Sequence, residues 1–162
     1  MAESLADLAR TLVSLSLEKG LSLCTAESCT GGMIAESITS VPGSSAVFLG
    51  ALVTYDERMK HAWLSVSEQT LASVGAVSAP CAAEMAEGAK KASGASLVLS
   101  VTGFAGPTGG NARDGVGTVY FGISSSEKTA VVRRVFEGDR TAVRRAATEE
   151  ALRLLTEAVK CI

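Results

Sequence analysis

The sequence predicts an α/β protein, a three-layer α/β/α sandwich around an open mixed sheet with at least one antiparallel strand. First, segments with helical spacing of apolar residues alternate with short apolar runs typical of strands. Second, the runs 117–124 and 130–136 are separated only by a short polar turn, which requires an antiparallel hairpin. Third, 47% of the residues are hydrophobic but only 4% are aromatic, so the core must consist mainly of Ala, Val, Leu and Ile.

The N-terminal half predicts two helices, two strands and a short helical turn. Leucines recur at helical spacing from Ser4 to Lys19, and Gly20 is a suitable residue to end that helix. A turn of small residues at 26–32 should open a second helix, and Asp56 should cap a short helical turn. The expected elements are a helix over 4–19, a strand over 21–25, a helix from the small-residue turn to residue 38, a break at 42–45 and a buried strand over 48–55.

The C-terminal half predicts one helix, three strands and a closing helix. Ser78-Ala79-Pro80 has the form of a helix start, because proline is tolerated where N–H groups have no partner. The segment 103–115 contains five glycines and one proline, so it must be a loop. The expected elements are a helix over 78–92 that stops near Gly94, strands over 95–102, 117–124 and 130–136, a turn over 125–128 and a helix capped by Gly138-Asp139 that runs to about residue 160.

Length and charge limit the class of protein. A chain of 162 residues has a single-domain length, and we expect one domain over 1–162. The net charge of −2 gives no general attraction to nucleic acid, so direct nucleic-acid binding is not expected. No run approaches the roughly 18–20 apolar residues of a membrane helix, and we find no signal peptide. We therefore expect no membrane contact and a cytoplasmic location.

Several chemistries are disfavoured by residue counts. The cysteines Cys24, Cys29, Cys81 and Cys161 lack C-x-x-C spacing, which argues against a disulfide framework and a zinc site. His61 is the only histidine, so a Ser-His-Asp site is not expected unless it uses that residue, and it is read as a surface residue. Glycine-rich nucleotide motifs are also absent from the sequence. We expect neither a metal nor a cofactor.

Three loops qualify as a ligand site, because ligands of open α/β sheets bind outside the carboxyl ends of the strands. These loops are 26–32, 55–60 and 103–115, each directly after a predicted strand. The first can present backbone N–H groups at a helix start, a natural seat for an anion. Glycines at 106–110 could form a second backbone nest, although such glycines are equally often present only to make tight turns.

A set of sequence strings in this order and spacing closely resembles the CinA C-terminal domain family, the nicotinamide-nucleotide amidases. The strings are TAESCTGG at 25–32, GSS at 43–45, VTY at 53–55, Lys60, GAVS at 75–78, GFAGP at 103–107, GG at 109–110, VGTV at 116–119 and GDR at 138–140. The resemblance covers nearly the whole chain and is with the stand-alone amidase form. The segment 111–114 follows no family string.

The resemblance implies an amidohydrolase that converts nicotinamide mononucleotide into nicotinate mononucleotide and ammonia, in pyridine nucleotide salvage. It places the catalytic serine, tyrosine and lysine on Ser45, Tyr55 and Lys60. It places the substrate-binding positions on Ser28, Gly32, Thr102, Gly103 and Arg140. We also expect a homo-oligomer.

The chemistry of these residues is consistent with the implied roles. A serine attacks an amide only when a base takes its proton, and a lysine serves as that base only when neutral. Burial next to Met59 and Trp63 would depress the pKa of Lys60 from about 10.4 toward neutrality. Tyr55 could relay a proton or orient the lysine through its hydroxyl. Arg140 is suited to a bidentate grip on the substrate phosphate.

Alternatives remain at the level of the nucleophile and of the function. Cys29 is a rival nucleophile, because a helix N-terminus lowers the pKa of a thiol. Ser45 could simply cap a helix, and Lys60 could be a solvated helix lysine. The chain could bind a nucleotide without turnover. The family's association with competence and DNA damage also suggests an interaction module, with the arginines between 133 and 145 as its surface.

Overall fold

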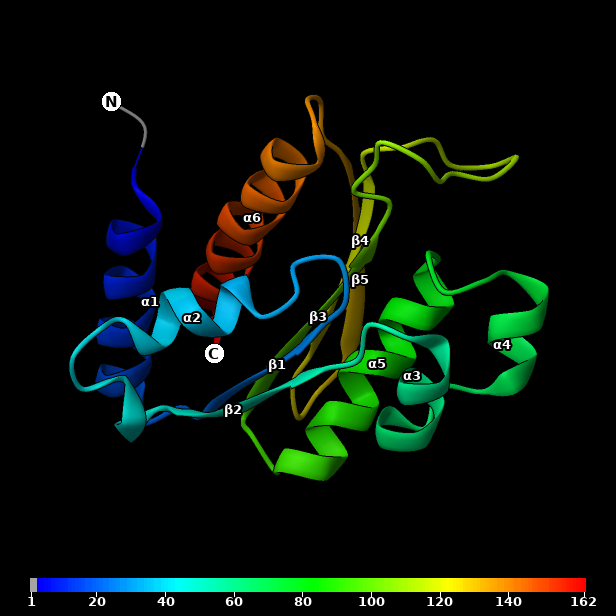
Figure 1. The fold of residues 1–162 in the computed structure, drawn as a ribbon. Helices are drawn as coiled ribbons and strands as arrows, with labels where there is room; N and C mark the ends of the chain where they lie inside the picture. Colours follow the sequence, from blue (N-terminus) through cyan, green and yellow to red (C-terminus); the bar gives the residue numbers. More distant parts are fainter. Residues whose placement is uncertain (1–2) are drawn as a thin grey trace.

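A computed structural model describes residues 3–162 as a five-stranded sheet with helices on both faces (Figure 1). The strands lie in the order β2-β1-β3-β4-β5. In chain order the elements are α1 (Leu5–Lys19), β1 (Leu23–Glu27), α2 (Met33–Thr39), a 3₁₀ turn η1 (Ser44–Ala46), β2 (Phe48–Val53), α3 (Glu57–Leu64), α4 (Glu68–Ser73), α5 (Ala79–Ser93), β3 (Leu97–Gly103), β4 (Thr118–Ser124), β5 (Thr129–Val135) and α6 (Arg140–Cys161).

The sheet is mixed, which confirms the predicted fold class. β2, β1 and β3 run parallel to one another, so their carboxyl ends lie at one edge of the sheet. β4 is antiparallel to both β3 and β5, and the β4–β5 hairpin turns through Ser125, whose N–H donates to the Lys128 carbonyl. The predicted hairpin is therefore present where the sequence placed it.

Two apolar layers cover the two faces of the sheet. The helices α1, α2 and α6 pack on one face, where Leu12, Leu99 and Leu152 are fully buried. On the other face α3 and α5 pack over the alternate strand residues, such as Val98 beside Met85, and α4 lies against α5. The core consists almost entirely of aliphatic residues, as the composition predicted.

Most predicted helix ends are confirmed by their caps. The side chains of Ser4, Asp56, Ser78 and Asp139 each accept a hydrogen bond from a backbone N–H in the first turn of the helix that follows. Gly20 and Gly94 end α1 and α5 in the left-handed conformation that favours glycine. The capping residues therefore gave correct boundaries at these helix termini.

The prediction for the second strand was wrong in one respect. β2 is an edge strand with alternating exposure rather than a buried strand, because it pairs only with β1. Its pairing contains a bulge: Leu23 is opposite Phe48 but Cys24 is opposite Gly50, so Leu49 is an extra residue. As a result Phe48 packs toward the α1 face, whereas Leu52 packs toward the α5 face.

The other differences concern short elements. Helix α4 was not predicted, because its six residues include no buried side chain and thus show no apolar face. β1 and β3 begin two residues later than expected and end two and one residues later, respectively. Such shifts are usual at strand ends, where the chain continues in an extended conformation.

A close approach between α3 and α5 yields the first prediction. A Cβ atom at Gly88 would lie 1.8 Å from the backbone oxygen of Leu64, so any side chain forces the two helices apart. We expect Gly88→Ala to lower the free energy of unfolding by about 1–3 kcal/mol or more, measured by urea denaturation. Gly115→Ala is the matched control, because a Cβ there meets no atom within 4 Å. Equal stability of the two variants would contradict the assigned helix contact.

Candidate active site

The three loops that follow β1, β2 and β3 line one pocket of about 280 Å³, as the strand-end argument predicted. The start of α6 and the segment before α5 complete its wall. The lining residues are Ser28, Cys29, Tyr55, Glu57, Lys60, Ala76, Val77, Thr102, Gly103, Phe104, Ala105 and Arg140. Of the eight predicted site residues, Ser45 and Gly32 do not line it.

Lys60 is the chemically unusual residue of this pocket. It lies on α3, and its side chain is only 1% exposed. Its Nζ atom is 2.7 Å from the Ser28 Oγ, 2.7 Å from the Thr54 carbonyl oxygen and 3.2 Å from the Tyr55 carbonyl oxygen. The expected burial of Lys60 is therefore present, and the alternative of a solvated helix lysine is wrong: the amine is held at the carboxyl ends of β1 and β2.

The surroundings of Lys60 suit both protonation states. Burial lowers the pKa of Lys60, although the nearby Cys81, Cys29, Glu57 and Asp56 act in the opposite direction. An ammonium donates three hydrogen bonds, one to each of the three oxygens. A neutral amine donates two, which satisfy the Thr54 and Tyr55 carbonyls, and its lone pair then faces the Ser28 hydroxyl. The neutral form is thus oriented to accept a proton from Ser28.

The turn before α2 does not offer an empty anion seat, in contrast to the prediction. The buried carboxylate of Glu27 occupies the N-terminus of α2. It accepts hydrogen bonds from the backbone N–H groups of Gly32, Ile34 and Ala35 at 2.8–3.2 Å. The hydroxyls of Thr25 and Thr30 also donate to this carboxylate. The anion that the helix start attracts is therefore part of the protein itself.

Of three predicted substrate-binding positions, one lies outside the pocket and two form its wall through contacts within the chain. Gly32 directs its N–H to Glu27 and lies outside the pocket lining. Thr102 is at the pocket wall, but its hydroxyl donates to the Ala76 carbonyl at 2.8 Å. Gly103 is required for space, since a Cβ there would lie 2.7 Å from the Val119 side chain and 2.8 Å from the Thr118 carbonyl oxygen. Thr102 and Gly103 therefore shape the wall.

Tyr55 and Arg140 meet at the pocket mouth. One guanidinium nitrogen of Arg140 donates to the Tyr55 hydroxyl at 3.0 Å, and another donates to the Gly106 carbonyl at 2.8 Å. Tyr55 is 61% exposed, and its hydrogen bond with Lys60 is made by its backbone carbonyl. Of the two roles suggested for the Tyr55 hydroxyl, orientation of the lysine has no contact to support it, and the proton relay stays a prediction. Among residues 3–162, no carboxylate forms a salt bridge with Arg140.

Within one chain, the structure does not bring Ser45 to Lys60. Ser45 lies in η1, before β2, whereas Tyr55 and Lys60 follow β2. A strand of six residues spans roughly 17–20 Å, so the two ends of β2 are far apart. Ser45 lines a separate hollow with Thr39, Ser44, Phe48, Leu49 and Gly50. The serine hydroxyl that contacts the Lys60 amine is that of Ser28.

Two alternatives from the sequence lose support. Cys29 is 5% exposed, and burial raises the pKa of its thiol to about 11, opposite to the lowering expected at a helix start. The thiol is therefore protonated at neutral pH and poorly nucleophilic. His61 lies outside the pocket lining, and its Nδ1 atom is 2.8 Å from the Val66 carbonyl oxygen.

The segment 111–114, which the sequence left without a role, fastens the glycine-rich loop. Asp114 is buried and accepts hydrogen bonds from Tyr120, Arg133 and Arg113. Its burial opposes ionisation, but these hydrogen bonds lower the pKa of the carboxyl overall. Arg113 also donates to the Val74 carbonyl, which ties the loop to the segment before α5. No sequence motif marked this network.

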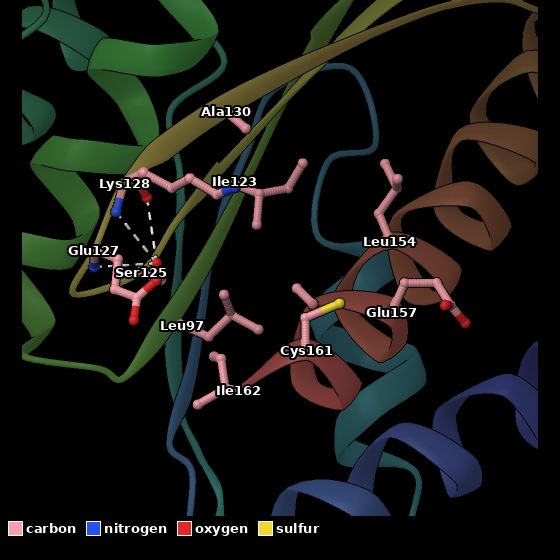
Figure 2. A pocket seen from close by; sticks show the side chains of 11 residues that line it. Leu97, Ile123, Ser125, Glu127, Lys128, Ala130, Leu154, Glu157, Cys161 and Ile162 are labelled. Carbon is pink, nitrogen blue, oxygen red and sulfur yellow. Dashed lines mark hydrogen bonds between the residues drawn. The ribbon is translucent and has the colours of Figure 1, made fainter.

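A second hollow, of about 320 Å³, lies at the other end of the sheet (Figure 2). Leu97, Ile123 and Leu154 form apolar walls between the sheet and α6, and the C-terminal Cys161 and Ile162 lie at its side. Although this hollow is larger, it lacks a buried ionisable side chain. The chemistry of the protein is therefore better placed at the Lys60 pocket.

Between residues 3 and 162, no group of three or more His, Cys, Asp or Glu side chains is placed to hold a metal ion. In the same range, none of the helices combines the length and the apolar character needed to cross a membrane.

Fold and site together define an α/β protein with a buried lysine–serine pair at the carboxyl ends of parallel strands. Residues 5–159 match the family model described as the CinA C-terminal domain. The chain belongs to this family.

Its relatives are of two lengths. The chain is 48% identical over 138 residues to a protein named nicotinamide-nucleotide amidohydrolase PncC from Escherichia coli K12, which covers 85% of this chain and 84% of that protein. It is 44% identical over 159 residues to a CinA-like protein from Leptospira borgpetersenii, covering 98% of this chain. The chain spans 38% of the length of that longer relative.

Solved structures in the family have the same fold. The competence/damage inducible protein CihA from Agrobacterium tumefaciens superposes with a TM-score of 0.92 and 38% identity, covering 99% of this chain and 98% of that one. A CinA superfamily protein from Klebsiella pneumoniae gives a TM-score of 0.95 at 31% identity, with 99% of this chain and all of that chain covered. The arrangement of strand-end loops around the pocket is therefore built on a fold that relatives share.

The Glu27 contacts yield the second prediction. Glu27→Gln replaces a buried acceptor of five hydrogen bonds by an amide that has only one acceptor oxygen. Because each unsatisfied buried donor costs about 1–3 kcal/mol, we expect a large drop in Tm and in the free energy of unfolding. Glu36→Gln, an exposed change within α2, the helix whose first N–H groups Glu27 binds, is the control and should have little effect. A Glu27→Gln protein as stable as the control would show that the charge is dispensable.

Proposed function

We propose that the chain hydrolyses the carboxamide of nicotinamide mononucleotide, giving nicotinate mononucleotide and ammonia. The observation that carries the proposal is the buried Lys60 amine, whose lone pair in the neutral form faces the Ser28 hydroxyl. The choice of nicotinamide mononucleotide as the substrate rests on the relative that is named nicotinamide-nucleotide amidohydrolase. Ammonia release from nicotinamide mononucleotide is the direct assay, and binding without release would favour a nucleotide-binding module instead.

In the proposed reaction Ser28 is the nucleophile and Lys60 is the base. The neutral amine of Lys60 takes the hydroxyl proton of Ser28 as the oxygen attacks the carboxamide carbon. The resulting ammonium is stabilised by the Thr54 and Tyr55 carbonyls, which already accept its other two hydrogens. Lys60 then gives the proton to the departing nitrogen, and ammonia leaves as the C–N bond breaks. A water molecule, deprotonated by the same amine, then attacks the ester carbon. The bond from that carbon to the Ser28 oxygen breaks, Lys60 returns the proton to this oxygen, and nicotinate mononucleotide leaves.

The negative oxygen formed during attack needs hydrogen-bond donors. The backbone N–H of Cys29 follows the proposed nucleophile directly and donates to no backbone carbonyl of residues 3–162. The N–H of Ser28, by contrast, is occupied by the Val101 carbonyl at 3.0 Å. Cys29 also lines the pocket, so we assign its N–H as an oxyanion donor.

Arg140 is the proposed contact for the substrate phosphate. Its guanidinium is anchored by two neutral oxygens, those of Tyr55 and Gly106, so its charge is not neutralised by a carboxylate salt bridge within residues 3–162. An arginine presents its donors in a planar fork that matches phosphate oxygens. The apolar wall of Val77, Phe104 and Ala105 then accommodates the flat pyridine ring.

The assignment of the nucleophile to Ser45, which the family resemblance implies, requires a second copy of the chain. Ser45 of one chain is at the opposite end of β2 from its own Lys60, so it could act only in the pocket of a partner. The contact between Ser28 and Lys60 within one chain supports Ser28 instead. The expected homo-oligomer therefore stays a prediction that the next experiment also tests.

The third prediction concerns Ser28 and Lys60. Ser28→Ala and Lys60→Met should each lower kcat roughly 10³-fold or more, and the double variant should be scarcely worse, because groups that act as one unit are not additive. The wild-type rate should fall on the acid side, because below the lowered pKa of Lys60 the amine is protonated and cannot accept the serine proton. Steady-state kinetics across pH provide the measurement.

Ser45→Ala is the comparison variant for this experiment, and it should retain most of the activity. If Ser45→Ala is inactive while Ser28→Ala is active, the nucleophile is Ser45. Mixing inactive Ser45→Ala with inactive Lys60→Met protein would then restore turnover, because an assembly of both contains one complete intersubunit site.

The fourth prediction concerns Arg140. Arg140→Ala should mainly raise KM for nicotinamide mononucleotide, by roughly 10-fold or more, because a phosphate contact binds ground state and transition state alike. Slow turnover of nicotinamide riboside, which lacks the phosphate, should change little. Arg153→Ala, an exposed change farther along α6, is the control. Equal losses on both substrates would show that Arg140 does not contact the phosphate.

A further inference from the structure

A second arginine of α6 contacts the turn that carries Ser28. Arg144 lies four residues after Arg140, so the two side chains project from the same side of the helix. Its Nε atom donates to the Cys29 carbonyl at 3.0 Å, and one terminal nitrogen donates to the Thr30 carbonyl at 3.1 Å. Both acceptors immediately follow the proposed nucleophile.

The turn 28–32 is thus held between two opposite charges. On one side Glu27 accepts from the N–H of Gly32 and from the hydroxyl of Thr30. On the other side Arg144 donates to the carbonyls of Cys29 and Thr30. A carboxylate attracts N–H groups and a guanidinium attracts carbonyls, so the pair fixes which way the peptide groups of the turn point.

The contact between Arg144 and the turn requires an arginine side chain and the absence of a side chain at Gly31. Gly31 has a φ of +58°, and a Cβ there would lie 3.2 Å from an Arg144 terminal nitrogen. Two successive carbonyls are bound by two nitrogens of one planar group, which a lysine ammonium cannot reproduce. Among residues 3–162, Arg144 forms no salt bridge with a carboxylate, in contrast to its neighbour Arg145, which pairs with Glu149.

We propose that Arg144 is a positioning residue, which holds the turn 28–32 so that the Ser28 hydroxyl stays against the Lys60 amine and the Cys29 N–H points into the pocket. This inference rests on the proposed function. Arg144 does not line the pocket and would not touch the substrate. It acts through Ser28 and Cys29, because a displacement of the turn lengthens the 2.7 Å contact between the Ser28 Oγ and the Lys60 Nζ.

The kinetic test compares Arg144→Lys and Arg144→Ala with Arg145→Ala. We expect both Arg144 variants to lose about 10–100-fold in kcat, with KM changed by less than about 3-fold, because orientation of the nucleophile is lost while substrate contacts remain. Methylguanidinium added to Arg144→Ala should recover part of the rate. Arg145→Ala removes an exposed arginine from the adjacent position and should behave as wild type.

A second measurement follows the turn without any activity. Cys29 is buried in this turn, whereas Cys24 lies on β1 and Cys81 on α5. Alkylation of each cysteine by iodoacetamide at pH 8, followed by peptide mass spectrometry, reports local opening at each thiol. In Arg144→Ala we expect faster labelling of Cys29, with Cys24 and Cys81 unchanged, and no change in Arg145→Ala.

The outcomes separate the two proposals. Unchanged kcat together with unchanged Cys29 labelling in Arg144→Ala overturns the positioning role. Equal acceleration at Cys24, Cys29 and Cys81 also overturns it, since the variant is then destabilised as a whole. If the wild type releases no ammonia, the proposed function fails, while selective labelling of Cys29 still supports the role of Arg144 in holding the turn.

Discussion

The burial of one lysine amine is the constraint on which the site depends. An ionisable amine withdrawn from water is tolerated only when its hydrogens and lone pair are all matched. For Lys60 the partners come from the turn after β1 and from the end of β2, while the side chain itself is carried by α3. The ends of two parallel strands and the start of a helix must therefore lie at fixed positions relative to one another. The order of elements β1-α2-β2-α3 brings this about, since parallel strands place both ends at one edge of the sheet.

A second buried charge, Glu27, complements the first. It is the last residue of β1 and is followed directly by Ser28, so the carboxylate and the serine face different parts of the same turn. The Glu27 carboxylate accepts hydrogen bonds from the N–H groups at the start of α2. On the opposite side of the turn, Arg144 donates hydrogen bonds to two backbone carbonyls. Cys29 packs this turn against the aliphatic core, and these charge-assisted hydrogen bonds fix its peptide groups. The position of the proposed nucleophile thus depends on these polar contacts as well as on the aliphatic core.

The sequence predicted the helices, strands and fold class better than the contacts between residues of the site. Helix caps such as Ser78 and Asp139, and the hairpin turn at 125–128, follow from local chemistry and were correct. Lys60, Tyr55, Ser28 and Arg140 were found because strand-end loops collect ligand-binding residues and because family strings mark them. The partner of Lys60, the filling of the α2 N-terminus by Glu27 and the raised pKa of Cys29 were not predictable from local chemistry. Each depends on which groups meet in three dimensions, and neither spacing nor composition reports that.

The bulge in β2 has a consequence for how this chain tolerates change. Phe48 and Leu52 are four residues apart, so their side chains would lie on the same face of a regular strand. The extra residue Leu49 places them on opposite faces of the sheet. Deletion of a single residue there would restore a regular strand and reverse the side-chain directions on one side of the deletion. One of the two aliphatic layers would then lose its contact with the edge strand, or the segment leading to Lys60 would rotate. A length change of one residue at this position is therefore more damaging than most substitutions, and insertions or deletions among functional relatives should avoid it.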